Sequence, residues 1–288
     1  MRKIHLCLTV LFLSKSFIGF AATVDSIEIA SVAMSKTYKA AVALPDSYQK
    51  NKSSYPVLYL LHGGAGHFRD WLTLTPDKML VKNLADQYNL IIVMPEGEAF
   101  SFYINSPVDK QSQFESYIVE DVIAKIDATY RTVKDKKGRV ITGLSMGGHG
   151  AMYLSARHPD LFCAAGSMSG AMDVDFNNWR LTPEFAERIR TGFRQIFGAD
   201  STTYSQYSVM SMADKIKTNG LKIIIDCGVD DFLIESNREL HRRLVYNHTL
   251  HDYTEHPGAH TWEYWQNSLP YHVLFFYNVL TANGVAVS

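Results

Sequence analysis

Cysteine is scarce in this chain of 288 residues, and two of its three cysteines, Cys163 and Cys227, lie beyond the N-terminal segment. Cys163 is expected to begin a strand, residues 163–169, and Cys227 to end another, residues 221–227. If these strands are parallel neighbours, the two cysteines lie roughly 15–20 Å apart at about 3.3 Å per residue. A disulfide needs Cα atoms within roughly 7 Å. We therefore expect two free, buried thiols.

The chain also lacks a marked excess of positively or negatively charged residues. The chain has 28 Lys and Arg residues against 29 Asp and Glu residues, and no basic run stands out. Neither nucleic acid nor an anionic membrane is therefore expected as a partner. The sequence contains no HExxH motif and no comparable group of metal ligands, so we expect no metal and no cofactor. Internal repeats and low-complexity segments are absent too.

The chain lacks an apolar run long enough to cross a bilayer. Its N-terminus instead has a basic start, Met1-Arg2-Lys3, a short apolar stretch at 4–13, and small residues at 19–22. This pattern is typical of a secretory signal peptide. We expect residues 1–22 to be removed and residues 23–288 to form a single domain that is secreted or periplasmic. The mature chain would carry 25 basic and 29 acidic residues, a net charge of −4.

Apolar runs and helical stripes alternate along most of the chain. Residues 26–33 and 37–44 suit an antiparallel strand pair, and later strands and helices alternate in a way that predicts a mostly parallel sheet covered on both faces. Residues 171–215 interrupt this alternation, and we interpret them as a small helical cap over the site. The expected strands are 56–62, 90–94, 139–143, 162–169, 222–226 and 252–255; the expected helices are 77–88, 115–130, 148–156, 182–197, 234–246 and 262–280.

The segment Gly143-Leu144-Ser145-Met146-Gly147 lies between an apolar strand and a helix. A serine in this GxSxG setting is typical of the nucleophile elbow of α/β-hydrolases. Side chains two residues before and after the serine would collide across so sharp a turn, which favours glycine at both places. Gly148 and Gly150 would let the helix pack close to neighbouring strands. Ser145 is therefore the expected nucleophile.

A serine nucleophile needs a histidine base and a carboxylate that orients the base. In α/β-hydrolases these follow in the order acid, then histidine. His260 is the predicted base because Pro257-Gly258 can turn it toward the sheet edge just before the last helix; His256, at a strand end, is the rival. For the acid, Asp230 and Asp231 stand nearly equal, and Asp226 is less favoured because it lies inside the strand.

The oxyanion that forms during attack needs preorganised N–H donors. Met146, the residue after the nucleophile, supplies one of them. The second is expected from the glycine-rich loop His62-Gly63-Gly64-Ala65-Gly66, whose backbone can approach a substrate closely.

Four segments form a recognisable pattern: Leu61-His-Gly-Gly64 with Asp70-Trp71, Gly143-Leu-Ser-Met-Gly-Gly-His-Gly-Ala151, Cys227-Gly-Val-Asp-Asp-Phe-Leu233 and His260-Thr-Trp-Glu-Tyr-Trp265. Together they resemble the putative-esterase family of α/β-hydrolases, over about residues 35–280. The family includes feruloyl and acetyl-xylan esterases of carbohydrate esterase family 1, tributyrin esterases, S-formylglutathione hydrolase and the mycolyltransferases. The resemblance implies Ser145 as nucleophile, His260 as base, Asp231 as acid, and Gly64 beside Met146 as oxyanion donors.

Export and the resemblance together indicate a serine carboxylesterase that hydrolyses carbohydrate-linked esters, feruloyl or acetyl, through an acyl-enzyme. The substrate would be a small-molecule or oligosaccharide ester. Alternatives are a general short-chain carboxylesterase, an S-formylglutathione hydrolase-like thioesterase, an exported acyltransferase and a non-catalytic sugar-binding module. Aromatic side chains expected near the site could stack on a hydroxycinnamoyl group or a sugar ring. They are Trp71, Phe100, Phe102, Tyr103, Phe176, Trp179 and Trp262.

Overall fold

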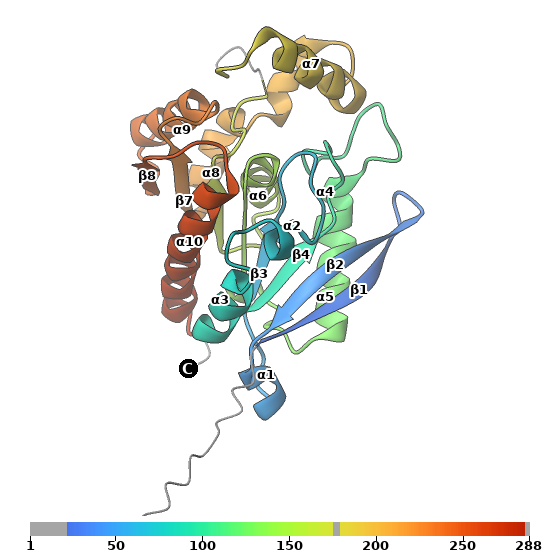
Figure 1. The fold of residues 1–288 in the computed structure, drawn as a ribbon, viewed down its shortest axis with the longest axis vertical. Helices are drawn as coiled ribbons and strands as arrows, with labels where there is room; N and C mark the ends of the chain where they lie inside the picture. Colours follow the sequence, from blue (N-terminus) through green and yellow to red (C-terminus); the bar gives the residue numbers. More distant parts are fainter. Residues whose placement is uncertain (1–21, 175–178, 286–288) are drawn as a thin grey trace, which may run out of the picture.

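A computed structural model describes residues 22–174 and 179–285 as an eight-stranded sheet with helices on both faces (Figure 1). The strand order is β1-β2-β4-β3-β5-β6-β7-β8. β2 pairs antiparallel with both β1 and β4, and the other neighbours are parallel, so the predicted α/β architecture is confirmed. The expected signal peptide lies outside the described residues, apart from Ala22. The strands are β1 (Thr23–Ser31), β2 (Lys36–Leu44), β3 (Val57–Leu61), β4 (Ile91–Pro95), β5 (Arg139–Gly143), β6 (Ala164–Met168), β7 (Lys222–Gly228) and β8 (Asp252–His256).

Strands β3 and β4 are apolar throughout because helices cover both of their faces. In β3, Leu58 and Leu60 face one side, where they join a core with side chains of α3 and α10. Val57, Tyr59 and Leu61 face the other side, in a core with α5, α6, α8 and α9. The helices are α1 (Ser47–Lys50), α2 (Asp70–Thr73), α3 (Leu80–Tyr88), α4 (Phe114–Ser116), η1 (Tyr117–Val122), α5 (Ile123–Thr129), η2 (Lys136–Gly138), α6 (Met146–Arg157), α7 (Pro183–Phe197), η4 (Ser201–Tyr207), η5 (Val209–Met212), α8 (Ala213–Asn219), α9 (Ile234–Tyr246) and α10 (Trp262–Ala282).

The helix predicted over 115–130 is continuous but not uniformly α-helical. Its middle part, η1, is a π-helix between α4 and α5. The stripe Ile118, Val122 and Ile126 repeats every four residues, which runs ahead of a 3.6-residue α-turn. The wider π-turn compensates for this drift, and all three side chains are fully buried.

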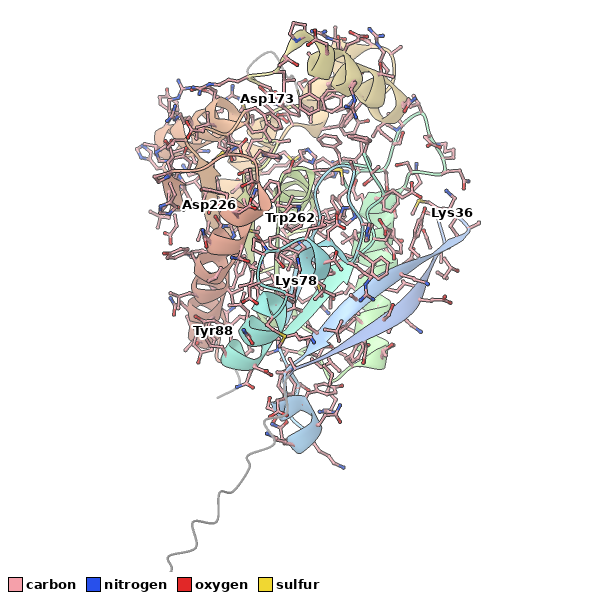
Figure 2. The ribbon with its side chains drawn as sticks, viewed as in Figure 1. Lys36, Lys78, Tyr88, Asp173, Asp226 and Trp262 are labelled. Carbon is pink, nitrogen blue, oxygen red and sulfur yellow. The ribbon has the colours of Figure 1, made fainter. Side chains whose placement is uncertain are left out.

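The cap contains the helix predicted at 182–197, which is α7. Thr182 caps its N-terminus by accepting a hydrogen bond from the Phe185 amide at 3.4 Å, and Ser, Thr, Asp or Asn is favoured there. One face of α7 packs against the body of the protein through Phe193 and Phe197, which meet Phe102. α7 lies at the top of Figure 1, beyond α6, and Asp173 marks the start of the cap in Figure 2.

Both later cysteines are free, as predicted. Cys163 immediately precedes β6 and Cys227 lies near the end of β7, the adjacent parallel strand. Cys227 is buried as predicted, but the prediction is wrong for Cys163, which precedes its strand and is only half-buried. Even this partial burial raises the pKa of the Cys163 thiol to about 11. Within residues 22–174 and 179–285, no helix combines the length and apolarity needed to cross a membrane.

Candidate active site

Ser145 occupies the turn between β5 and α6 in a strained backbone conformation, with φ 54° and ψ −117°. A Cβ on Gly143 would lie 2.6 Å from the carbonyl oxygen of Gly147, so the collision expected across the turn is confirmed there. Gly147 is required for a different reason, since its Cβ would lie 2.6 Å from the carbonyl oxygen of His62 at the end of β3. The two sides of the turn are therefore closely packed against each other, and the turn is also closely packed against the end of β3.

The serine, the histidine and one of the two aspartates form a chain of hydrogen bonds. Nε2 of His260 lies 2.9 Å from Oγ of Ser145, and Nδ1 lies 2.8 Å from Oδ2 of Asp231. Asp231 is fully buried, whereas Asp230 is exposed. His256 is also exposed and stacks on Tyr271 instead of approaching the serine. The structure thus brings together Ser145, His260 and Asp231, and leaves out their rivals.

The orientation of the histidine follows from its partners. A carboxylate accepts hydrogen bonds only, so Nδ1 of His260 donates to Asp231 and Nε2 is left to accept the serine proton. The second oxygen of Asp231 accepts a hydrogen bond from the Leu233 amide at 2.8 Å. The carboxylate is therefore held at both oxygens, and it fixes the tautomer in which Nε2 of His260 accepts from Ser145.

Backbone contacts hold the acid loop against the histidine loop. The Asp230 amide donates to the carbonyl of Gly258 at 2.9 Å, and the Val229 amide donates to that of His256 at 3.0 Å. Gly228 allows this approach, because a Cβ there would lie 2.3 Å from the Gly258 carbonyl oxygen. Thr261 then caps α10, which begins directly after the loop that carries His260.

Two backbone amides close to Ser145 have no hydrogen-bond partner among the described residues. In the described part of the chain, the amides of Gly64 and Met146 donate neither to a loop or turn carbonyl nor to a side chain. Met146 is the first residue of α6, where an N–H group has no intrahelical acceptor. The amides beside them are occupied: Ala65 donates to Ala99 at 2.6 Å and Gly147 to Leu144 at 2.7 Å. The free pair has the character of an oxyanion hole.

A pocket of about 280 Å³ opens at Ser145 and His260. Most of its wall is glycine-rich loop and apolar side chain, with the carboxylate of Asp70 as a polar group, a composition common in ligand pockets. Of the predicted aromatic contacts that the structure describes, Trp262 alone lies in this wall; its position at the start of α10 is labelled in Figure 2. The lining residues are Gly63, Gly64, Ala65, Gly66, Asp70, Leu74, Leu144, Ser145, His260, Trp262 and Trp265.

Three of the predicted substrate contacts are corrected by the structure, because they belong to the core. Trp71 is 1% exposed and donates its indole N–H to the carbonyl of Leu61. Tyr103 is fully buried, and its hydroxyl donates to the carbonyl of His62. Phe102 is 5% exposed within the aromatic packing beneath the cap. Each ring is buried in the core, and none of the three lines the pocket.

The remaining aromatic predictions lie in or near the cap. Trp179 is 8% exposed and packs edge-on against Phe193, so it stabilises the cap. Phe100 is 40% exposed, and its ring lies about 3.6 Å from where a Cβ of Gly64 would stand. Phe176 falls outside the described residues.

Two rings next to the histidine were missed by the sequence reasoning. The ring centroid of Phe232 lies 4.5 Å from that of His260, and Trp265 meets the imidazole edge-on at 4.8 Å. Both positions had a usable signal, since Phe232 directly follows the acid and Trp265 lies one turn into α10. The imidazole is therefore in contact with two apolar ring surfaces.

Residues 31–276 match the family model described as Putative esterase. The chain belongs to this esterase family. It is 28% identical over 235 residues to an acetyl esterase of Caldicellulosiruptor saccharolyticus, covering 77% of this chain and 84% of that protein. It is also 28% identical over 240 residues to an esterase of Mycobacterium tuberculosis, covering 76% of this chain but about half, 51%, of that protein.

The fold is also that of solved esterase structures. A ferulic acid esterase superimposes with a TM-score of 0.77 at 26% identity, over 91% of this chain and 100% of that one. The substrate-bound serine hydrolase FphF of Staphylococcus aureus gives the same TM-score at 21% identity, over 90% of this chain and all of the other, a likeness of fold. Together with the family match, these similarities make the protein an esterase with an α/β-hydrolase fold.

Proposed function

We propose that this esterase is an exported serine carboxylesterase that cleaves feruloyl or acetyl groups from carbohydrates. The observation that carries the proposal is the continuous hydrogen-bonded chain from Ser145 through His260 to the buried Asp231. A hydroxyl, an imidazole and a carboxylate in this succession are the requirements for activating a serine.

In the proposed reaction, Oγ of Ser145 attacks the ester carbonyl as Nε2 of His260 takes its proton. Asp231 stabilises the imidazolium that results. The amides of Gly64 and Met146 donate to the tetrahedral oxyanion. When the intermediate collapses, His260 returns the proton to the leaving alcohol and the acyl group stays on the serine. Water, deprotonated by the same imidazole, then releases the acid and regenerates the enzyme.

Two relatives support the substrate class, and the N-terminal pattern supports export. The names acetyl esterase and ferulic acid esterase belong to proteins 28% and 26% identical to this chain. The basic and apolar segments at residues 1–22 motivate secretion to the periplasm or beyond. A carbohydrate ester outside the cell is a substrate that an exported enzyme can reach.

The test is a comparison of ester substrates with a nucleophile variant. We expect turnover of feruloylated arabinose oligosaccharides or acetylated xylan in addition to 4-nitrophenyl acetate, with S-formylglutathione as the competing thioester. Ser145→Ala should retain the wild-type melting temperature and lose about 10⁴-fold or more in kcat, because the base then has nothing to activate. A loss below tenfold would show that another residue is the nucleophile.

Substrate and location are tested separately. Turnover of 4-nitrophenyl acetate without turnover of any carbohydrate ester would refute the substrate class but not the mechanism. Retention in the cytoplasm of a bacterial host, with residues 1–22 still attached by mass spectrometry, would refute export.

A further inference from the structure

His62 is buried beside the glycine loop and is held at both ring nitrogens. It is 1% exposed. Nδ1 lies 2.8 Å from the carbonyl oxygen of Gly63, the next residue. Nε2 lies 2.9 Å from the amide nitrogen of Gly97, on the loop after β4. The imidazole therefore links two loops, and its contacts lie outside the hydrogen-bonded chain of the nucleophile.

The two contacts together decide which nitrogen carries the proton. A backbone N–H can only donate, so Nε2 accepts from Gly97 and the neutral ring carries its proton on Nδ1. Nδ1 then donates to the Gly63 carbonyl. If the ring takes up a second proton, Nε2 can turn to Oε1 of Glu96, 3.3 Å away. The Gly97 amide also lies 3.1 Å from that oxygen, so it keeps an acceptor. In both protonation states Nδ1 donates to Gly63.

Glu96 is well suited to anchor the far side of this ring. Burial alone would raise the pKa of its carboxyl, but the Glu98 and Phe68 amides and His62, which can donate to this carboxylate only when its ring is protonated, outweigh burial and lower the pKa. The carboxylate thus stays ionised at neutral pH, and it joins the loop after β3 to the loop after β4.

The Gly63 carbonyl belongs to the same peptide group as the Gly64 amide. A trans peptide is planar, with its C=O and N–H pointing in opposite directions, so fixing one fixes the other. Glycine on both sides gives this peptide unusual rotational freedom. A stiffer residue at position 63 would force the Leu144 side chain to move, because its Cβ would lie 2.4 Å from Cδ1 of Leu144. The orientation of the peptide group between Gly63 and Gly64 must therefore be set by a contact from outside the loop backbone.

We propose that His62 is a positioning residue for the oxyanion hole: by donating from Nδ1 to the Gly63 carbonyl, it aims the Gly64 amide at the developing oxyanion. The inference rests on the proposed serine mechanism. The Gly66 amide also donates to the Gly63 carbonyl, at 3.3 Å. This longer contact tightens the turn, but it comes from the same glycine-rich loop, whereas the imidazole is held by Gly97 on the loop after β4.

Two substitutions separate the Nδ1 contact from the rest of the ring. The amide nitrogen of Asn, two bonds from Cβ, can stand where Nδ1 stands, so His62→Asn keeps the donor to Gly63. The terminal group of Gln reaches the position of Nε2, so His62→Gln keeps an acceptor for Gly97 and loses the donor. His272→Gln is the matched control, since His272 is a fully buried histidine on α10 that contacts Thr142.

The measurement is kcat and KM on 4-nitrophenyl acetate, with a melting temperature for each variant. A lost oxyanion donor costs about 10²–10³-fold in kcat, and a misaimed one should cost less. We expect His62→Gln to lower kcat about 10- to 100-fold with KM within about threefold, and His62→Asn to stay within about threefold of wild type in both. His272→Gln should lower the melting temperature and leave kcat within about threefold.

Equal kcat values for the Asn and Gln variants, whether both high or both low, would overturn the proposal. A Gln variant that is better than the Asn variant would do the same, because it would show that filling the space of the ring is what matters. A wild-type enzyme without esterase activity would instead refute the serine mechanism, and the inference with it.

Discussion

Substituting Gly228 by alanine should separate the acid and histidine loops. The added Cβ would lie 2.3 Å from the carbonyl oxygen of Gly258 and 2.7 Å from its carbonyl carbon, both backbone atoms. Carbon–oxygen contacts normally stand at about 3.3 Å or more, so one loop must move by about 1 Å. A misplacement of that size in catalytic geometry costs on the order of 100-fold in rate. The crowding should also lower the free energy of unfolding by about 1–3 kcal/mol.

The assay is kcat on 4-nitrophenyl acetate together with urea unfolding, and Gly192→Ala is the control. Gly192 lies on α7, where a new Cβ would meet nothing closer than Cγ of Phe100 at 4.0 Å. That variant should keep wild-type kcat and gain about 0.5–1 kcal/mol, since alanine is preferred to glycine in a helix. If Gly228→Ala retains kcat within twofold while remaining folded, the loop contact does not set the distance between His260 and Ser145.

Two further predictions concern the acid and a buried histidine. Asp231→Asn should lower kcat by about 10⁴-fold because the base loses its orienting carboxylate, whereas the exposed Asp230→Asn should stay within twofold; equal kcat values would contradict the assignment. Burial lowers the pKa of His149 to about 4, below the ordinary value of about 6.5. The neutral imidazole therefore contributes its full share to the free energy of unfolding above pH 6.5. This share, up to about 3 kcal/mol, is lost as the pH falls from 6.5 toward 4, because the unfolded chain takes up the proton first. Urea unfolding at pH 7 and 4.5 should show this loss in the wild type and a smaller one in His149→Gln; equal losses would contradict it.

The sequence predicts well those features whose cause is local. The strand, the GxSxG turn and the following helix are encoded in consecutive residues, so Ser145 can be predicted as the nucleophile from the sequence alone. His260 could be found because a proline and a glycine precede it and a helix follows it. The choice between Asp230 and Asp231 had no local cause. It depends on which carboxylate the turn after β7 directs inward, and the structure buries Asp231 completely.

The aromatic contacts could not be predicted because their environments are set by distant segments. Trp71 lies on the short helix α2 after β3, and Tyr103 lies on the loop after β4. Their polar atoms reach backbone carbonyls at the end of β3, and the rings fill the core. Phe232 meets the imidazole because the loop after β7 and the loop before α10 are hydrogen-bonded to each other. The contact cannot be predicted from the residue pattern of the loop after β7 or from that of the loop before α10.

The strain at Ser145 is sustained by its neighbours, and the same turn provides two functions. The Ser145 amide donates to Met168 at 2.9 Å, and its carbonyl accepts from His149 at 3.0 Å and Ala171 at 3.3 Å. Both peptide groups of the strained residue are therefore fixed, which offsets a conformational cost of about 1–3 kcal/mol. A turn this sharp starts α6 at Met146, too early for the Met146 amide to find a carbonyl in the helix. The geometry that exposes the serine hydroxyl thus also frees an N–H group beside it, so a substitution that relaxes the turn should weaken nucleophile and oxyanion donor together.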